Sequence, residues 1–264
     1  MAYDVPDEIV VESDGPVRII RLNRPDELNA VNPGLHRGVA DVFPQIDADG
    51  AARSVVITGN GRAFSAGGDF TLLDDMANDT EVRQREITVG RVLVLNMIRC
   101  RVPVVTAVNG PAVGLGCSLV ALSDVVYMAE TAYLADPHVV VGLVAADGGP
   151  LTWPLHTSLL LAKEYAFTGD RISAARAAQI GLANHVVADD SVLDEALACA
   201  HRIAKLPPQA VQATKRVLNL HLERAVLATI DFAMGAEYDS FDTDELRANV
   251  DRFLERDATS GGQR

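Results

Sequence analysis

Two glycine-rich segments, each preceded by an apolar run, constrain the fold of this chain most strongly. Residues 54–58 precede the segment 64–69, and residues 104–108 precede the segment 110–116. Such apolar runs are typical of buried strands. Glycines just beyond a strand let the backbone approach a ligand closely and direct free N–H groups at it. One N–H from each loop can form an oxyanion hole, which stabilises negative charge on a carbonyl oxygen. The two segments therefore predict an enzyme that forms an enolate.

Composition narrows the classes of partner and the expected location. The chain has 264 residues, 48% of them hydrophobic, and a net charge of −13, which favours a globular protein and argues against nucleic-acid binding. The acidic N-terminus has no apolar core, so we expect no signal peptide. No apolar run approaches the ~18 residues that span a bilayer. The three cysteines have neither metal-type nor disulfide-type spacing, which fits a reducing compartment, and we expect a cytoplasmic location.

The hydrophobic pattern predicts an α/β fold with a helical C-terminal part. Residues 8–22 have the pattern of a β-hairpin, and residues 32–47 that of a helix whose second residue is proline. Strand, glycine loop and helix then alternate to about residue 185. We therefore expect an α/β core over residues 1–190 and a helical region over 191–264 that packs on the core or on neighbouring subunits. The helices expected in this region cover 193–206, 208–227, 232–238 and 243–256.

Four segments in a fixed order carry a resemblance to a known family. They are 23–25 with 28–30, 64–69, 109–116, and 168–170 followed by 174–182 and 186–187. With these segments the chain resembles the crotonase (enoyl-CoA hydratase/isomerase) superfamily over roughly its whole length. The resemblance implies a spiral of β-β-α repeats and a C-terminal helical region that builds a homotrimer or a dimer of trimers. It also implies an acyl-CoA substrate, as in fatty acid metabolism, with coenzyme A as part of the substrate and no metal or redox cofactor.

The resemblance also assigns roles to positions of this chain. Gly68 and Leu115 match the two oxyanion-hole residues, and since both act through backbone N–H, a leucine at the second position retains the donor. The other positions expected to bind the substrate are Gly67 and Gly114 in the same loops, Ala30 and Ala66 at the adenine end of CoA, and Arg24 near a CoA phosphate.

The acid–base positions depart from the family. A hydratase of this kind uses two glutamates to hold and deprotonate one water, and this chain has Ser118 and His138 in their places. His138 is followed by Asp147, which is expected to accept from one ring nitrogen and raise the basicity of the other. Ser118 either holds a water or only fills space. On this hypothesis His138→Ala abolishes turnover and leaves the fold largely intact.

The His138 and Asp147 pair leaves three functions open. A similar pair occurs in the 6-oxocamphor hydrolase branch of the superfamily, whose members cleave a carbon–carbon bond of cyclic β-diketones without CoA. The first interpretation is a lyase or isomerase of the enoyl-CoA hydratase/isomerase type, and the second is such a hydrolase. The third is a non-enzymatic binding scaffold, which the intact oxyanion loops disfavour. Affinity for CoA discriminates between the first two.

Overall fold

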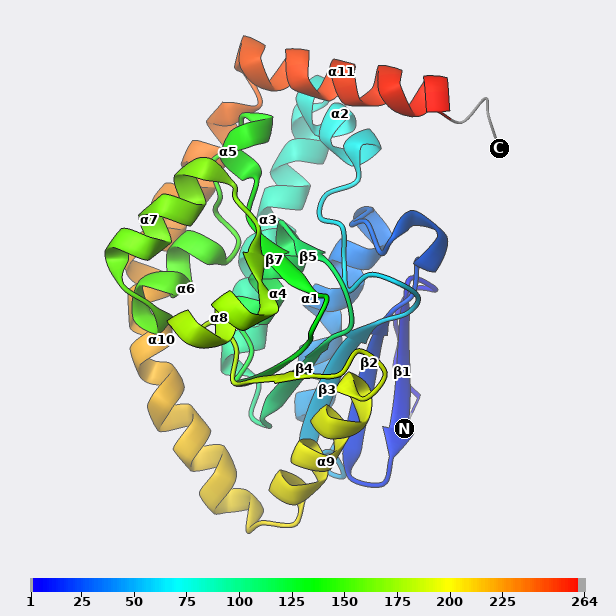
Figure 1. Ribbon diagram of the computed structural model, residues 1–264, viewed down its shortest axis with the longest axis vertical. Helices are drawn as coiled ribbons and strands as arrows, with labels where there is room; N and C mark the ends of the chain where they lie inside the picture. The colour runs from blue at the N-terminus through cyan, green and yellow to red at the C-terminus, as the bar shows by residue number, and fades with distance from the viewer. Residues whose placement is uncertain (1, 261–264) are drawn as a thin grey trace.

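The computed structural model describes residues 2–260 and is built on a six-stranded sheet (Figure 1). The order of its strands is β1-β2-β3-β4-β6-β9. The β1–β2 pair is antiparallel and the other pairs are parallel. A second sheet has the order β5-β7-β8. The predicted α/β fold is thereby confirmed. The last four residues of the expected C-terminal region lie outside the described part of the chain.

The bounds of the elements follow in chain order: β1 (Ile9–Asp14), β2 (Val17–Leu22), η1 (Pro25–Glu27), α1 (Pro33–Ala48), β3 (Ser54–Gly59), α2 (Phe70–Asn78), α3 (Thr80–Arg99), β4 (Val104–Val108), β5 (Ala112–Val113), α4 (Leu115–Ala121), β6 (Val125–Ala129), β7 (Tyr133–Ala135), α5 (His138–Val141), α6 (Gly149–His156), α7 (Leu159–Thr168), β8 (Ile172–Ser173), α8 (Ala174–Ile180), β9 (His185–Val187), α9 (Val192–Ala204), α10 (Pro208–Ser240) and α11 (Asp244–Ser260).

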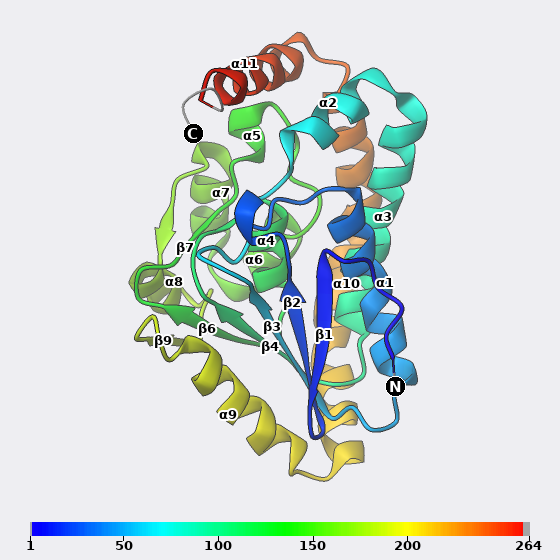
Figure 2. The same ribbon diagram turned by 90° about the vertical axis from the view of Figure 1, so that its right-hand side faces the viewer.

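Helices cover both faces of the larger sheet. Every residue of β3 and β4 is buried, as expected of parallel strands with both faces covered. Helix α9 packs on β3, β4 and β6, while α1 packs against α3 on the other side (Figure 2). The predicted hairpin and first helix are present, and the Asn32 side chain caps α1 by accepting from the Leu35 N–H. The carboxyl ends of β3 and β4 therefore lie side by side, where both glycine loops begin.

The C-terminal helices differ from the prediction in one respect. Helix α10 is continuous over 33 residues, where the pattern predicted two helices separated near residues 228–231. No proline interrupts this stretch, and Gly235 lies within the helix with open space where a side chain would be. Val217, Leu218 and Phe232 are exposed along α10. These are surfaces on which the predicted trimer can form, and the oligomeric state remains a prediction.

Helix α11 lies across α2 and α5 at one end of the molecule in both views (Figures 1 and 2). A second apolar cluster joins these elements, formed by Leu72, Met76, Leu143, Phe241, Leu246 and Val250. It is separate from the main core between the sheet and its helices. Within residues 2–260 no helix is both long and apolar enough to cross a membrane.

Candidate active site

The two glycine loops present unpaired backbone N–H groups to one cavity. Val31 donates to the Gly67 carbonyl at 2.8 Å and accepts from the Asp69 N–H at 3.1 Å. This parallel bridge directs the intervening Gly68 N–H away from Val31. Within residues 2–260 the Gly68 N–H donates to no acceptor. Leu115 is the first residue of α4, so its N–H has no acceptor within the helix and none elsewhere in residues 2–260. Both residues line a cavity of about 150 Å³.

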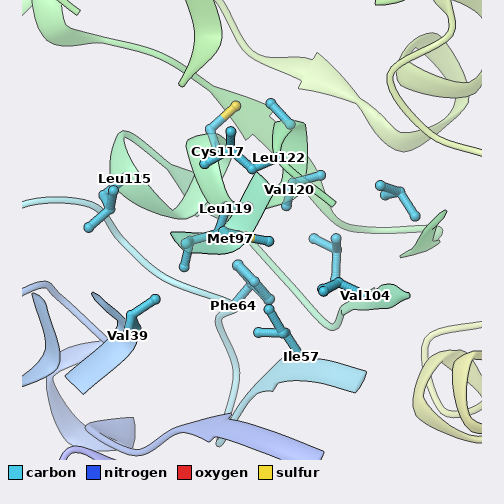
Figure 3. Packing of buried hydrophobic residues seen from close by; sticks show 14 of the residues in the cluster. Val39, Ile57, Phe64, Met97, Val104, Leu115, Cys117, Leu119, Val120 and Leu122 are labelled. Carbon is cyan, nitrogen blue, oxygen red and sulfur yellow. The ribbon is translucent and has the colours of Figure 1, made fainter. Parts of the chain in front are cut away.

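Close approach of the loops depends on glycine. Gly67 and Gly114 have φ angles of +91° and +52°, which side chains other than glycine rarely adopt. A methyl group on Gly67 would lie only 3.1 Å from the Val113 carbonyl oxygen of the second loop. The Leu115 side chain belongs to the buried core (Figure 3), so it leaves its own N–H unobstructed. The arrangement has the form of the predicted oxyanion hole.

Hydrogen bonds from and to Asn29 hold the first glycine loop in place. It is fully buried, and its Nδ2 donates to the carbonyls of Asn60 and Ala63, both at 2.9 Å. The Ser65 hydroxyl donates to the Asn29 carbonyl at 2.8 Å. Asn29 adopts a left-handed conformation with φ of 55°, which asparagine tolerates better than most residues. The loop that carries Gly68 is thus held rigidly.

His138 begins α5 and faces this cavity. Its Nδ1 pairs with Asp136 Oδ1, while Asp147 Oδ1 lies 4.0 Å from its Nε2. Asp136, and not Asp147 as the sequence hypothesis had it, therefore orients the imidazole. The reason is local: β7 ends at Ala135, and the turn through Pro137 brings residues 136 and 138 together. The Asp136-Pro137-His138 spacing was the signal for this pair in the sequence.

Ser118 positions Asp147. The Ser118 hydroxyl donates to Asp147 Oδ1 at 2.7 Å and lies 3.3 Å from the Gly114 carbonyl in the preceding helical turn. Gly148 makes this possible, because a methyl group there would lie 2.3 Å from the Ser118 Cβ. Ser118 therefore does more than fill space, because its hydroxyl makes a hydrogen bond. The partner in this structure is the Asp147 carboxylate and not the water that the sequence hypothesis expected.

A third acid, Glu237 of α10, lines the same cavity and was missed by sequence analysis. It is a single glutamate on a helix that was expected only to pack, so no sequence pattern indicates it. Burial and the charge of Asp147 raise the pKa of Glu237 to about 8. Glu237 is therefore a neutral carboxylic acid at neutral pH.

The charge around His138 determines its resting state. Burial alone lowers its pKa, but the charges of Asp136 and Asp147 outweigh burial and raise the pKa of His138 to about 10. At neutral pH the residue is an imidazolium between two aspartates. It is therefore poised to donate a proton, whereas the sequence hypothesis gave it the role of a base.

The predicted substrate-binding residues fall into two groups. Ala66, Gly67 and Gly114 line the cavity with the oxyanion residues. Arg24 instead donates to the Ala30 carbonyl and to Asp69 Oδ2, the latter at 3.2 and 3.3 Å, and neither Arg24 nor Ala30 lines the cavity. The predicted contacts of Arg24 and Ala30 with CoA remain predictions.

Comparisons with known proteins agree with this geometry. The family model for enoyl-CoA hydratase/isomerase matches residues 12–263. A probable enoyl-CoA hydratase of Rhizobium meliloti is 30% identical over 254 residues, covering 96% of each chain. The 2,3-dehydroadipyl-CoA hydratase of Escherichia coli is 33% identical and covers 84% of this chain and 85% of its own. An enoyl-CoA hydratase/isomerase crystal structure from Mycobacterium paratuberculosis is 64% identical, with a TM-score of 0.93 over 95% of this chain and 100% of that one. The chain belongs to the enoyl-CoA hydratase/isomerase family of the crotonase superfamily.

Proposed function

We propose that this enzyme adds water to the double bond of an enoyl-CoA thioester, with Asp147 as the base and His138 as the acid. The observation that carries the proposal is that the free N–H groups of Gly68 and Leu115 face the same cavity as both side chains. Two N–H donors there would polarise the thioester carbonyl and hold the enolate oxygen. Coenzyme A enters as part of the substrate.

The proposed reaction balances within these groups. Asp147 takes a proton from water as the water oxygen bonds to the β-carbon, and the electron pair of the double bond moves to the carbonyl oxygen. The enolate then collapses as its α-carbon takes the Nε2 proton of His138. Asp147 returns its proton to His138 Nε2, from which its Oδ1 is 4.0 Å distant. The net change is the addition of one water.

This assignment supplies an acid and a base without the two usual glutamates. The positions of those glutamates hold Ser118 and His138, and Asp147 lies 2.7 Å from the Ser118 hydroxyl and 4.0 Å from His138 Nε2, which supports its role as the base. Glu237, neutral at neutral pH, supplies a hydrogen-bond donor to the cavity and takes no part in the proton transfers. A carboxylate base beside proton donors is what hydration of a double bond needs.

A second candidate is cleavage of a carbon–carbon bond in a cyclic β-diketone. Asp147 would then direct water onto a ketone, the enolate would leave into the oxyanion hole, and His138 would protonate its α-carbon. The observation that favours it is that Arg24 donates to the Ala30 carbonyl and to Asp69, so both residues expected to contact CoA are already engaged.

An isotope experiment tests the proposal. Purified enzyme is incubated in ¹⁸O-labelled water with short enoyl-CoA thioesters and with cyclic β-diketones, and Asp147→Asn serves as the inactive control. We expect one labelled hydroxyl in the product from enoyl-CoA and unchanged diketone. A labelled, ring-opened carboxylic acid from the diketone would contradict hydration and support the second candidate.

The pH profile of kcat reports on Glu237. Because we propose that Glu237 acts as a neutral hydrogen-bond donor beside Asp147, kcat is expected to fall as the pH rises past about 8, where Glu237 loses its proton and adds a negative charge to the cavity. Glu237→Gln resembles the neutral acid at every pH. We expect the variant to retain kcat at neutral pH within about tenfold and to lose it only toward about pH 10, where His138 deprotonates. An alkaline limb that is the same in both enzymes would refute the role of Glu237.

A further inference from the structure

A second pair of polar side chains lines the same cavity, and both residues are far in sequence from the acid–base groups. His36 of α1 and Glu86 of α3 both line it. The remaining wall on this side is apolar and includes Leu72, Leu73, Met76, Ile87 and Met234. Polar side chains are expensive to bury in such surroundings unless their hydrogen bonds are satisfied. The proposed reaction assigns no role to this pair of residues.

Only one ring nitrogen of His36 makes a hydrogen bond within the described chain. Its Nδ1 lies 3.0 Å from Glu86 Oε2, and Arg85 Nε donates to Glu86 Oε1 at 3.0 Å. Burial raises the pKa of Glu86, but hydrogen bonds from His36 and Arg85 outweigh this and lower it, so Glu86 is a carboxylate that fixes the proton on Nδ1. His36 Nε2 has no hydrogen-bond partner among residues 2–260. The His36 side chain is 12% exposed and lines the cavity, so Nε2 is accessible there to a ligand.

Gly90 keeps the space beside His36 Nε2 open. A methyl group on Gly90 would lie 3.6 Å from that nitrogen and 3.8 Å from the Met234 Cε, and Gly90 itself lines the cavity. These are ordinary contact distances, so alanine would fit and would fill this space. A ring nitrogen without a partner, set beside the apolar residues of the cavity, is the kind of polar group that fixes the orientation of a ligand.

We propose that His36 Nε2 accepts a hydrogen bond from a hydroxyl group on the acyl chain of the substrate. The inference deepens the proposed function and rests on an acyl-CoA being the substrate. Glu86 disfavours an anionic group, because its carboxylate lies against the other side of the same imidazole. The preferred substrates are thus hydroxylated acyl chains, and plain hydrocarbon chains bind less well.

Calorimetric binding tests this without turnover. The probes are CoA, hexanoyl-CoA, its 4-, 5- and 6-hydroxy derivatives, and adipoyl-CoA, which ends in a carboxylate. We expect at least one hydroxy derivative to bind about tenfold more tightly than hexanoyl-CoA, the size of one net hydrogen bond. In Gly90→Ala, and in His36→Leu, the ratio of these two dissociation constants is expected to fall to about one. Gly90→Ala leaves the His36–Glu86 pair in place and substitutes a better helix former, so it guards against a folding artefact.

The outcomes separate the two proposals. Equal affinity for hexanoyl-CoA and all hydroxy derivatives would overturn the assignment of His36 and leave the hydratase proposal standing. Tightest binding of adipoyl-CoA would also overturn it, because the subsite would then select an anion. Acyl-CoA probes that bind no better than CoA would overturn the hydratase proposal and this inference together.

Discussion

Asp147→Asn is expected to fold as the wild type does and to lose about 10²–10⁴-fold in kcat, the usual contribution of a general base. Asparagine keeps the shape of the side chain and the oxygen that accepts from Ser118 at 2.7 Å. It cannot take a proton from water. The change therefore removes basicity and leaves the hydrogen-bond geometry, so KM should change little. The measurement is steady-state hydration of an enoyl-CoA, with thermal unfolding recorded alongside.

Two further variants sharpen this result. Asp190→Asn makes the same chemical change at an exposed position, and it should leave kcat unchanged. Ser118→Ala removes the hydroxyl that holds Asp147 but leaves the carboxylate, so we expect a smaller loss of about tenfold, the size of one net hydrogen bond. A fully active Asp147→Asn enzyme would refute Asp147 as the base.

The oxyanion loops could be predicted from sequence because their chemistry belongs to the backbone. An apolar run marks a buried strand, and glycines directly after it indicate where the chain turns with free N–H groups. This pattern indicated the two loops, the resemblance to the family identified Gly68 and Leu115 within them, and both residues line one cavity. The leucine at the second position does not block the backbone N–H, because its side chain packs into the core.

The acid–base groups were predicted less well because side-chain partners depend on tertiary packing. Asp136 and Asp147 both lie near His138 in sequence, and only the turn at Pro137 decides that Asp136 makes the direct contact. Glu237 is 99 positions (237 − 138) beyond His138, and it lies on α10, which continues unbroken through residues 228–231 to the cavity. The sequence pattern predicted two separate helices in this region, so it did not indicate that Glu237 reaches the cavity. No local pattern in one sequence contains that information.

His138→Ala is expected to abolish turnover and also to lower the free energy of unfolding by about 3–5 kcal/mol, the usual cost of breaking a buried ion pair. The sequence hypothesis expected an intact fold. Asp136 is only 2% exposed, its Oδ1 pairs with His138, and its Oδ2 has no hydrogen-bond partner in the described chain. Alanine at position 138 would leave this carboxylate buried and unpaired. Chemical denaturation of both proteins measures the difference.

The pH dependence and a double variant identify the cause of that loss. The pKa of His138 is raised from 6.5 to about 10 in the folded protein, so its stabilising effect is complete below about pH 6.5 and is lost as the pH rises toward 10. The difference in stability between wild type and His138→Ala should shrink over the same range. Asp136→Ala/His138→Ala removes the unpaired charge and should be more stable than His138→Ala alone, although still inactive. Wild-type stability of His138→Ala, or a double variant less stable than the single one, would show that Asp136 does not depend on His138 for its burial.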